Sequence, residues 1–230
     1  MDIISVSDIG VKNGVNQDNY WSAILSVDGK ELGLLCLCDG MGGLDNGEIA
    51  SKMVISSIRE SILDGIVDNL DSVLQNVNMS IYSLSKEEKM GTTCTLLLCS
   101  EGKYIIYHIG DSRCYLIRDN KPILLTKDHS AVKEYNVSES DPMYKKLRGK
   151  LTRCIGVEES IKVDIYKGEY LAEDIFLICC DGFWHYFEKL NDIVRGCNKE
   201  ELIELINKYK GLGERDNITV SVLSIGGEEN

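Results

Sequence analysis

Two apolar runs end in the same dipeptide: GLLCLCDG at residues 33–40 and IFLICCDG at residues 175–182. An unbroken apolar run of this length predicts a strand that is buried on both faces. Each strand then delivers a carboxylate, Asp39 or Asp181, to the end of a hydrophobic core. A carboxylate there is costly to desolvate, and two close together repel each other, so we expect a cation nearby. The alternative is that each Asp-Gly pair only opens a turn, and the repeated pattern weighs against it.

The chain around these runs divides into blocks of short strands and blocks of helices. Strands are predicted at 3–6, 20–26, 32–38, 93–99, 104–109, 114–118, 123–126, 161–166, 175–180 and 218–225, and helices at 49–62, 68–85 and 199–209. Asp45 or Asn46 is the expected cap of the first helix. The strands between 93 and 126, divided by the turns SEGK and RDNK, predict an antiparallel meander. The polar stretch 127–150 predicts a mobile excursion with one helix. Helices grouped apart from antiparallel strands indicate an α+β layered sandwich.

Composition narrows the class of protein. The 230 residues suit one domain, and 43% hydrophobic with 27% charged residues is ordinary for a globular chain. A net charge of −12 argues against nucleic acid or an anionic membrane as partner and favours metal cations. No apolar run is long enough to cross a bilayer and the start carries no signal-peptide pattern, so we expect a cytoplasmic protein, and nothing requires more than a monomer.

The cysteines point to a reducing compartment and a packing role. Their number, nine, is odd, and no CxxC pair occurs, so neither a disulfide framework nor a zinc ribbon is favoured. Most of them lie inside apolar runs. We expect them to be small core side chains rather than ligands or nucleophiles.

Three further acids stand beside predicted strand boundaries: Asp18 in NQDNY, Asp111 in GDSR and Asp216 in RDNITV. With Asp39 and Asp181 they could converge on one edge of the sandwich. Oxygen ligands suit hard cations such as Mg²⁺ or Mn²⁺, whereas zinc would require histidine or cysteine, and the three histidines are scattered. A shared carboxylate and a backbone carbonyl could hold two such ions about 3.5–4 Å apart, a spacing at which a bridging water becomes a nucleophile.

The sequence resembles the metal-dependent protein phosphatase family known as PP2C or PPM, and the resemblance spans about residues 5–222. It rests on eight motifs in the order and approximate spacing that the family uses: NQDNY, CDGMGG, GTTCTLL, IGDSRCYLIR, LTKDHS, LTRCIG, ICCDGFW and DNITV. The DGMGG form is similar to bacterial members, since animal members usually carry histidine at the position of Met41. The resemblance implies a four-layer α-β-β-α sandwich, with two antiparallel sheets flanked by helix pairs, in a single phosphatase domain over residues 1–230.

The resemblance also implies a role for each acid. Two Mg²⁺ or Mn²⁺ ions, and a weaker third, are expected to be held as follows: Asp39 bridges the first two, the carbonyl of Gly40 binds the second, Asp181 and Asp216 bind the first, Asp18 holds metal-bound water, and Asp111 binds the third, with Asp181 shared. The implied activity is hydrolysis of phosphoserine or phosphothreonine by a hydroxide that bridges the metals, without a phosphoenzyme. Metal-bound water is the expected proton donor to the leaving group. His129 is a weaker candidate, since it also reads as a histidine packed beside a turn.

Two places depart from the family pattern. The arginine that usually clasps the substrate phosphate, in R-x-x-N-x-D, is replaced by Asn13, with Lys12 beside it. Lys12 and Asn13 are therefore the candidates for contact with the phosphate, although a solvated surface role fits Lys12 equally well. Residues 130–150 correspond to the flap that borders the site in relatives. Gly149 stands there where an asparagine often precedes the LTR motif.

Three functions remain open at this level. The leading one is a protein serine/threonine phosphatase of bacterial signalling that acts on phosphorylated proteins opposite a cognate kinase. The second, suggested by Asn13, is a catalytically weak module of the same fold that binds phosphoproteins or acts as a sensor. The third is a phosphatase for small metabolites or nucleotides, although the glycines of CDGMGG lack the GxxxxGK[ST] spacing of a phosphate-binding loop.

Overall fold

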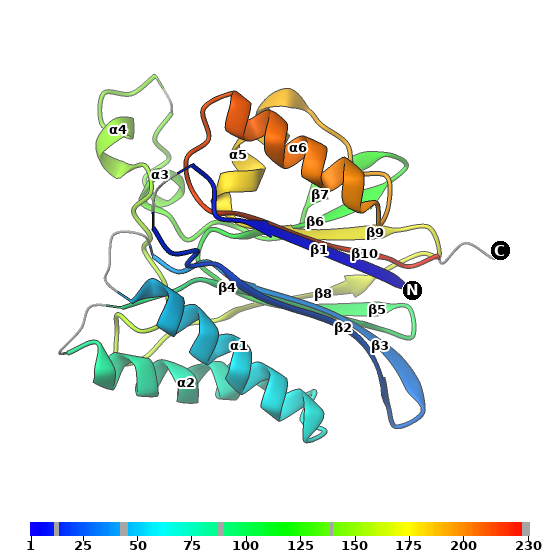
Figure 1. Cartoon of the computed structure of the whole chain (residues 1–230). Helices are drawn as coiled ribbons and strands as arrows, with labels where there is room; N and C mark the ends of the chain where they lie inside the picture. The colour runs from blue at the N-terminus through cyan, green and yellow to red at the C-terminus, as the bar shows by residue number, and fades with distance from the viewer. Residues whose placement is uncertain (12–13, 42–45, 87–89, 139, 227–230) are drawn as a thin grey trace.

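Two five-stranded antiparallel sheets lie face to face in the computed structural model, which describes residues 1–11, 14–41, 46–86, 90–138 and 140–226 (Figure 1). The β1 sheet consists, in spatial order, of β1 (Asp2–Asp8), β10 (Ile218–Ser224), β9 (Ile175–Cys179), β6 (Arg113–Arg118) and β7 (Lys121–Leu124). The β2 sheet consists of β2 (Asn19–Val27), β3 (Lys30–Cys38), β4 (Cys94–Ser100), β5 (Lys103–Ile109) and β8 (Asp164–Glu169).

Helices cover the outer face of each sheet. The pair α1 (Gly47–Leu63) and α2 (Leu70–Leu84) covers the β2 sheet, and the pair α5 (Asp181–Leu190) and α6 (Lys199–Gly211) covers the β1 sheet (Figure 1). Two short helices, α3 (Ala131–Glu134) and α4 (Tyr144–Leu147), lie beyond one end of the sandwich. This arrangement confirms the predicted four-layer α-β-β-α architecture. None of the described helices combines the length and the apolar character needed to span a bilayer.

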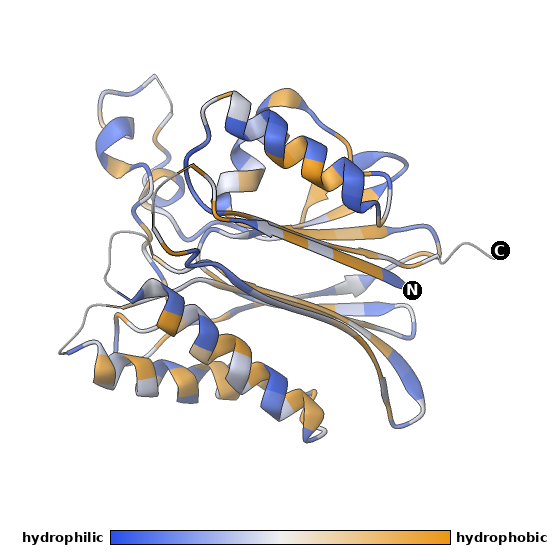
Figure 2. Cartoon of the chain, viewed as in Figure 1, coloured by the Kyte–Doolittle hydropathy of each residue, from blue (hydrophilic) through white to orange (hydrophobic). Residues whose placement is uncertain are grey.

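The apolar runs at residues 33–40 and 175–182 form β3 and β9, and both strands are buried on both faces over most of their length. On β3, Leu35 and Leu37 pack between the sheets while Leu34 and Cys36 pack beneath α1 and α2. The side chains of β9 alternate in the same way between the inter-sheet core and the core under α5 and α6. Figure 2 shows the hydrophobic strands between helices that carry both polar and apolar residues. Because each strand alternates between two cores, neither face needs polar residues.

The prediction that the cysteines are core side chains is confirmed for most of them. Seven of the nine are buried, and Cys154 and Cys197 are half-buried. Their small apolar side chains fit between the larger residues of the layered cores.

The structure corrects the predicted meander. β4 and β5 belong to the β2 sheet, whereas β6 and β7 belong to the β1 sheet, so the chain changes sheets after β5. Gly110 makes this crossing possible with φ of +113°, and a Cβ atom there would lie 2.5 Å from the side chain of Thr93. The turn signals divide the strands correctly but do not report which sheet receives each hairpin.

Three local predictions also differ from the structure. Helix α5 is missing from the prediction because its first residue, Asp181, reads as the end of the preceding strand. The described part of the stretch 127–150 contains two short helices instead of one. Asn46 precedes α1 in a left-handed conformation and makes no side-chain cap hydrogen bond, and Asp45 lies outside the described residues.

Candidate metal centre

Five predicted acids come together where β3 and β9 end, at the end of the sandwich that carries α3 and α4 (Figure 1). Desolvation raises the pKa of Asp39 well above its usual range, and repulsion from Asp18, Asp181, Asp111 and Asp216 raises it further. Desolvation likewise raises the pKa of Asp181, and repulsion from Asp111, Asp216 and Asp18 raises it further. Both sheets contribute to this acid cluster. The cluster therefore stores repulsion that a cation would relieve.

Hydrogen bonds to threonines fix the main chain of Asp39. Its amide donates to Oγ1 of Thr93 at 2.9 Å, and its carbonyl accepts from the amide of Thr93 at 2.9 Å and from Oγ1 of Thr92 at 2.9 Å. Oγ1 of Thr93 also bonds to Oγ of Ser112 at 2.8 Å. The backbone of Asp39 is therefore fully paired, and its carboxylate remains for the cluster.

Asp18 contains a buried oxygen that fits a cation. Oγ1 of Thr219 donates to Oδ2 of Asp18 at 2.6 Å, which links the start of β2 to β10 across the two sheets. Oδ1 of the same carboxyl is buried and accepts no hydrogen bond from a described residue. An orphaned carboxylate oxygen is costly unless a positive group lies nearby. Asp18, Asp39 and Cys180 each offer one ligand atom, a carboxylate oxygen or a sulfur, and these three atoms lie within 4.8 Å of one another.

Asp181 and Asp216 lie where the chain enters α5 and β10. Asp181 is the first residue of α5, where the helix dipole favours negative charge. Oδ1 of Asp216 accepts from the amide of Asn217 at 3.0 Å. Glu214 was missed in the sequence reasoning: its Oε1 accepts from the amide of Asp216 at 3.0 Å, and its charge helps to raise the pKa of Asp181. Its place two residues before Asp216 was the only available signal.

Asp111 rests on an aromatic and ionic support that the sequence reasoning also missed. Nε1 of Trp184 donates to the carbonyl of Asp111 at 2.9 Å. The guanidinium of Arg113 lies 3.4 Å from the centroid of the Trp184 ring and bonds to both carboxylate oxygens of Asp128, at 2.9 and 2.7 Å. Burial raises the pKa of Asp111 to about 7; the charge of Asp128 adds to this and that of Arg113 opposes it. The Arg113–Trp184 support thus links α5 to the loop that carries Asp111.

The two Asp-Gly pairs are not simple turns. Asp181 begins a helix, and Asp39-Gly40 continues toward the bridge between Gly40 and Thr92. A Cβ atom on Gly40 would lie 2.5 Å from the carbonyl oxygen of Gln17, and one on Gly182 would lie 2.2 Å from that of Asn217. The glycines are needed because backbone packs directly against them, which brings neighbouring loops close to the acids.

The remaining sequence candidates divide between the described and undescribed parts of the chain. His129 is buried; its Nδ1 accepts from the amide of Gly110 at 3.0 Å, and its Nε2 lies 3.1 Å from Oδ2 of Asp164. Burial lowers the pKa of His129. Both ring nitrogens therefore serve the fold, in agreement with the packed interpretation. Lys12 and Asn13 lie outside the described residues.

Substitution of Asp18 should reveal, through the pH dependence of folding stability, the cost of burying its charge. Burial raises the pKa of Asp18 to about 6, so the folded state binds this proton more tightly than the unfolded chain does. This group's contribution to folding stability is therefore lost as pH rises from about 4 to above 6. In chelator, Asp18→Asn should be more stable than the unmodified protein by on the order of 2 kcal/mol at about pH 8 and nearly equal to it at about pH 4.5. Thermal unfolding at both pH values measures this, and an equal shift at both would contradict it.

Comparison with known proteins adds independent information. A family model described as "Protein phosphatase 2C" matches residues 20–139. The chain is 32% identical to a putative protein phosphatase 2C-type of Streptococcus pyogenes, with 97% of each covered, and 30% identical to protein phosphatase PhpP of Streptococcus pneumoniae, with 100% and 99% covered.

Solved structures agree with these relatives. A bacterial serine phosphatase superposes with a TM-score of 0.82 at 25% identity over 100% of both chains. The catalytic domain of the serine threonine protein phosphatase PstP, in complex with two manganese ions, superposes with a TM-score of 0.77 at 27% identity, with 98% of each chain covered.

Proposed function

The chain belongs to the protein phosphatase 2C family and is a protein serine/threonine phosphatase, and we propose that the acid cluster between its two sheets is the catalytic centre. The observation that carries this proposal is the convergence of carboxylates with raised pKa values at one end of the sandwich. Perturbed carboxylates gathered at one place are typical of sites built for chemistry or for metal.

We propose that these carboxylates hold Mg²⁺ or Mn²⁺. The family is metal-dependent, and the related PstP structure holds two manganese ions. Two ions would be held by Asp39, the carbonyl of Gly40, Asp181 and Asp216, and a third by Asp111 with Asp181, while Asp18 supports the set. The donors are oxygens, which suit hard cations, and the orphaned Oδ1 of Asp18 is consistent with positive charge at this place.

When bound, the ions supply positive charge that stabilises the phosphoryl transition state and lowers the pKa of water. The protein's own groups prepare the site in three further ways. The paired backbone of Asp39 holds its carboxylate in place before substrate arrives, so less reorganisation is needed during the reaction. Trp184 fixes the carbonyl of Asp111, and the close packing at Gly40 and Gly182 keeps the surrounding loops near the acids.

Hydrolysis assays test this proposal. Purified protein should release phosphate from p-nitrophenyl phosphate and from a phosphothreonine peptide when Mn²⁺ or Mg²⁺ is present, and lose both activities in excess chelator. Activity that persists in chelator would refute the role of metal. Tight phosphopeptide binding without turnover would instead support the non-catalytic module.

Residues 130–150 are proposed as a flap that selects protein substrates. The segment is closed at its base, where the amide of Ala131 donates to the carbonyl of Lys150 at 2.8 Å and that of Thr152 to the carbonyl of His129 at 2.8 Å. The described residues between 132 and 149 are exposed or half-buried, so this part can be exchanged above the base without disturbing the core.

Exchange of residues 133–147 for a Gly/Ser linker should therefore separate two activities. We expect kcat/KM on a phosphoprotein to fall about tenfold, because contacts remote from the phosphate are lost, and that on p-nitrophenyl phosphate to change less than about twofold. Equal effects on both substrates would show that the segment supports the catalytic centre rather than the substrate.

The family indicates the class of substrate, which is phosphorylated proteins. We also propose that a cognate serine/threonine kinase opposes this phosphatase. We propose further that the protein is cytoplasmic and monomeric, with one phosphatase domain over residues 1–230. The net charge of −12 supports solubility and repels nucleic acid and anionic membranes. Size-exclusion chromatography tests the monomer.

A further inference from the structure

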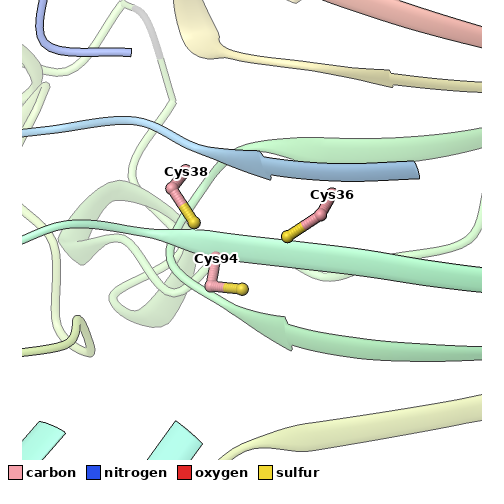
Figure 3. A group of neighbouring side chains, drawn as sticks. All are labelled: Cys36, Cys38 and Cys94. Carbon is pink, nitrogen blue, oxygen red and sulfur yellow. The ribbon is translucent and has the colours of Figure 1, made fainter. Parts of the chain in front are cut away.

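Three buried thiols face one another beneath the catalytic end of the molecule. Cys36 and Cys38 lie on β3 and Cys94 on β4, and Figure 3 shows their sulfur atoms turned into one space. All three side chains are 0% exposed, and their Sγ atoms lie within 4.8 Å of one another. The strand register pairs Leu37 with Thr95, which places Cys38 opposite Cys94. We call these three residues the trithiol cluster.

The trithiol cluster differs from ordinary buried cysteines in its geometry. Three sulfurs bound to one central atom at about 2.3 Å lie no more than about 4.0 Å apart, so a contraction on the order of 1 Å would complete a three-sulfur site. Thiolates are soft ligands and select thiophilic elements over Mg²⁺ or Mn²⁺. The trithiol cluster therefore does not compete for the ions that the acid cluster takes.

The surroundings restrict the charge of any adduct. The trithiol cluster lies in the apolar core under α1 and α2, with Ala50 and Val54, and one residue from Asp39. Three thiolates around Cu⁺ or Zn²⁺ would leave net negative charge in this core, beside carboxylates that already repel one another. A trivalent element replaces three protons and leaves the site neutral.

We propose that the trithiol cluster is a binding site for trivalent arsenic, taken up as arsenous acid. In the reaction, As(OH)₃ and three thiols give As(S-Cys)₃ and three waters: three As–O and three S–H bonds break, three As–S and three O–H bonds form, and no electrons are transferred. Entry requires local opening of the buried strands, so uptake is slow and mild denaturant accelerates it.

Arsenic bound at the trithiol cluster would change the geometry of the acid cluster through the backbone. Cys38 precedes Asp39 and Cys94 follows Thr93, and these neighbours pair through the hydrogen bonds that fix Asp39. Contraction of the trithiol cluster shifts both strands at that point, so arsenic should inhibit the phosphatase. This consequence rests on the proposed catalytic role of Asp39, whereas the binding site does not.

The test uses arsenite and the full chain. After incubation and desalting, one arsenic per chain is expected by elemental analysis, with three sulfur neighbours by X-ray absorption. Cys94→Ala and Cys36→Val should each lose the three-sulfur signature. Cys114→Ala, which removes an equally buried thiol from the inter-sheet core, should keep it. Circular dichroism checks folding, and if one variant fails to fold the other decides.

Two sulfur neighbours in the unmodified protein, or a three-sulfur signature that survives in a folded Cys94→Ala or Cys36→Val variant, would overturn the proposal. Parallel assays should show inhibition of the unmodified protein and of Cys114→Ala only. If the purified protein has no phosphatase activity, the proposed function fails while the arsenic stoichiometry still decides the binding site.

Discussion

Asp39→Asn is expected to reduce kcat on a phosphopeptide by about 10³-fold or more, and at the same time to raise the melting temperature of the metal-free protein. Activity falls because the carboxylate proposed to bridge two ions is lost, and charged groups that act in the transition state contribute factors of this size. Stability rises because repulsion from Asp18 and Asp181 disappears. We expect a gain of about 1 kcal/mol, as is common when a strained functional site is relaxed.

Two measurements check this prediction together. Phosphate release with saturating Mn²⁺ gives kcat, and thermal unfolding in chelator gives the stability. Asp68→Asn is the matched control, since it makes the same chemical change at an exposed position. A variant that loses activity but is also less stable would indicate that Asp39 supports the fold rather than the chemistry.

Arg113→Met should cause the largest loss of stability, about 3–5 kcal/mol, because it leaves a buried carboxylate unpaired. The Arg113 and Asp128 side chains are only 2% and 3% exposed, and Nη1 of Arg113 also lies 2.7 Å from Oε2 of Glu188. Methionine fills much of the volume but replaces neither the charge nor the hydrogen bonds. Urea unfolding measures the loss of stability as a shift of the midpoint urea concentration.

Lys30→Met is the control for this second prediction. Lys30 pairs with Glu101 at 2.6 Å, but the two side chains are 57% and 60% exposed, so the loss should stay below about 1 kcal/mol. Equal losses in the two variants would mean that burial of the Arg113 pair carries no special cost. Arg113→Met/Asp128→Leu should recover part of the stability, since no orphaned charge remains.

The strands and the acids were predictable because their signals are local. Continuous apolar runs report burial on both faces, and an acid at the end of such a run has few structural reasons to be there. The residues that support the acids were not predictable in the same way. Trp184 meets Asp111 only because α5 begins at Asp181, and the helix was itself hidden by an Asp-Gly pair that reads as a turn.

The partition of strands between the sheets depends on contacts that no local pattern reports. β5 and β6 follow each other closely along the chain, yet they lie in different sheets because Gly110 turns the chain against Thr93. Glu214 joins the cluster through Asp216, and its place two residues before Asp216 is a weak signal for such a contact. Sequence patterns thus predicted which residues end strands and missed which loops meet.

The acid cluster draws on both sheets and on residues from Asp18 to Asp216. Ribosomes make a chain from its amino end, so Asp18 and Asp39 emerge long before Asp181, and Asp216 comes later still. A nascent or prematurely terminated chain that stops before β10 carries an incomplete set of the proposed ligands, however well its first helices and strands have formed. With the proposed set of ligands, activity is therefore expected only after β10 has been synthesised, and fragments that end before β10 should not dephosphorylate proteins.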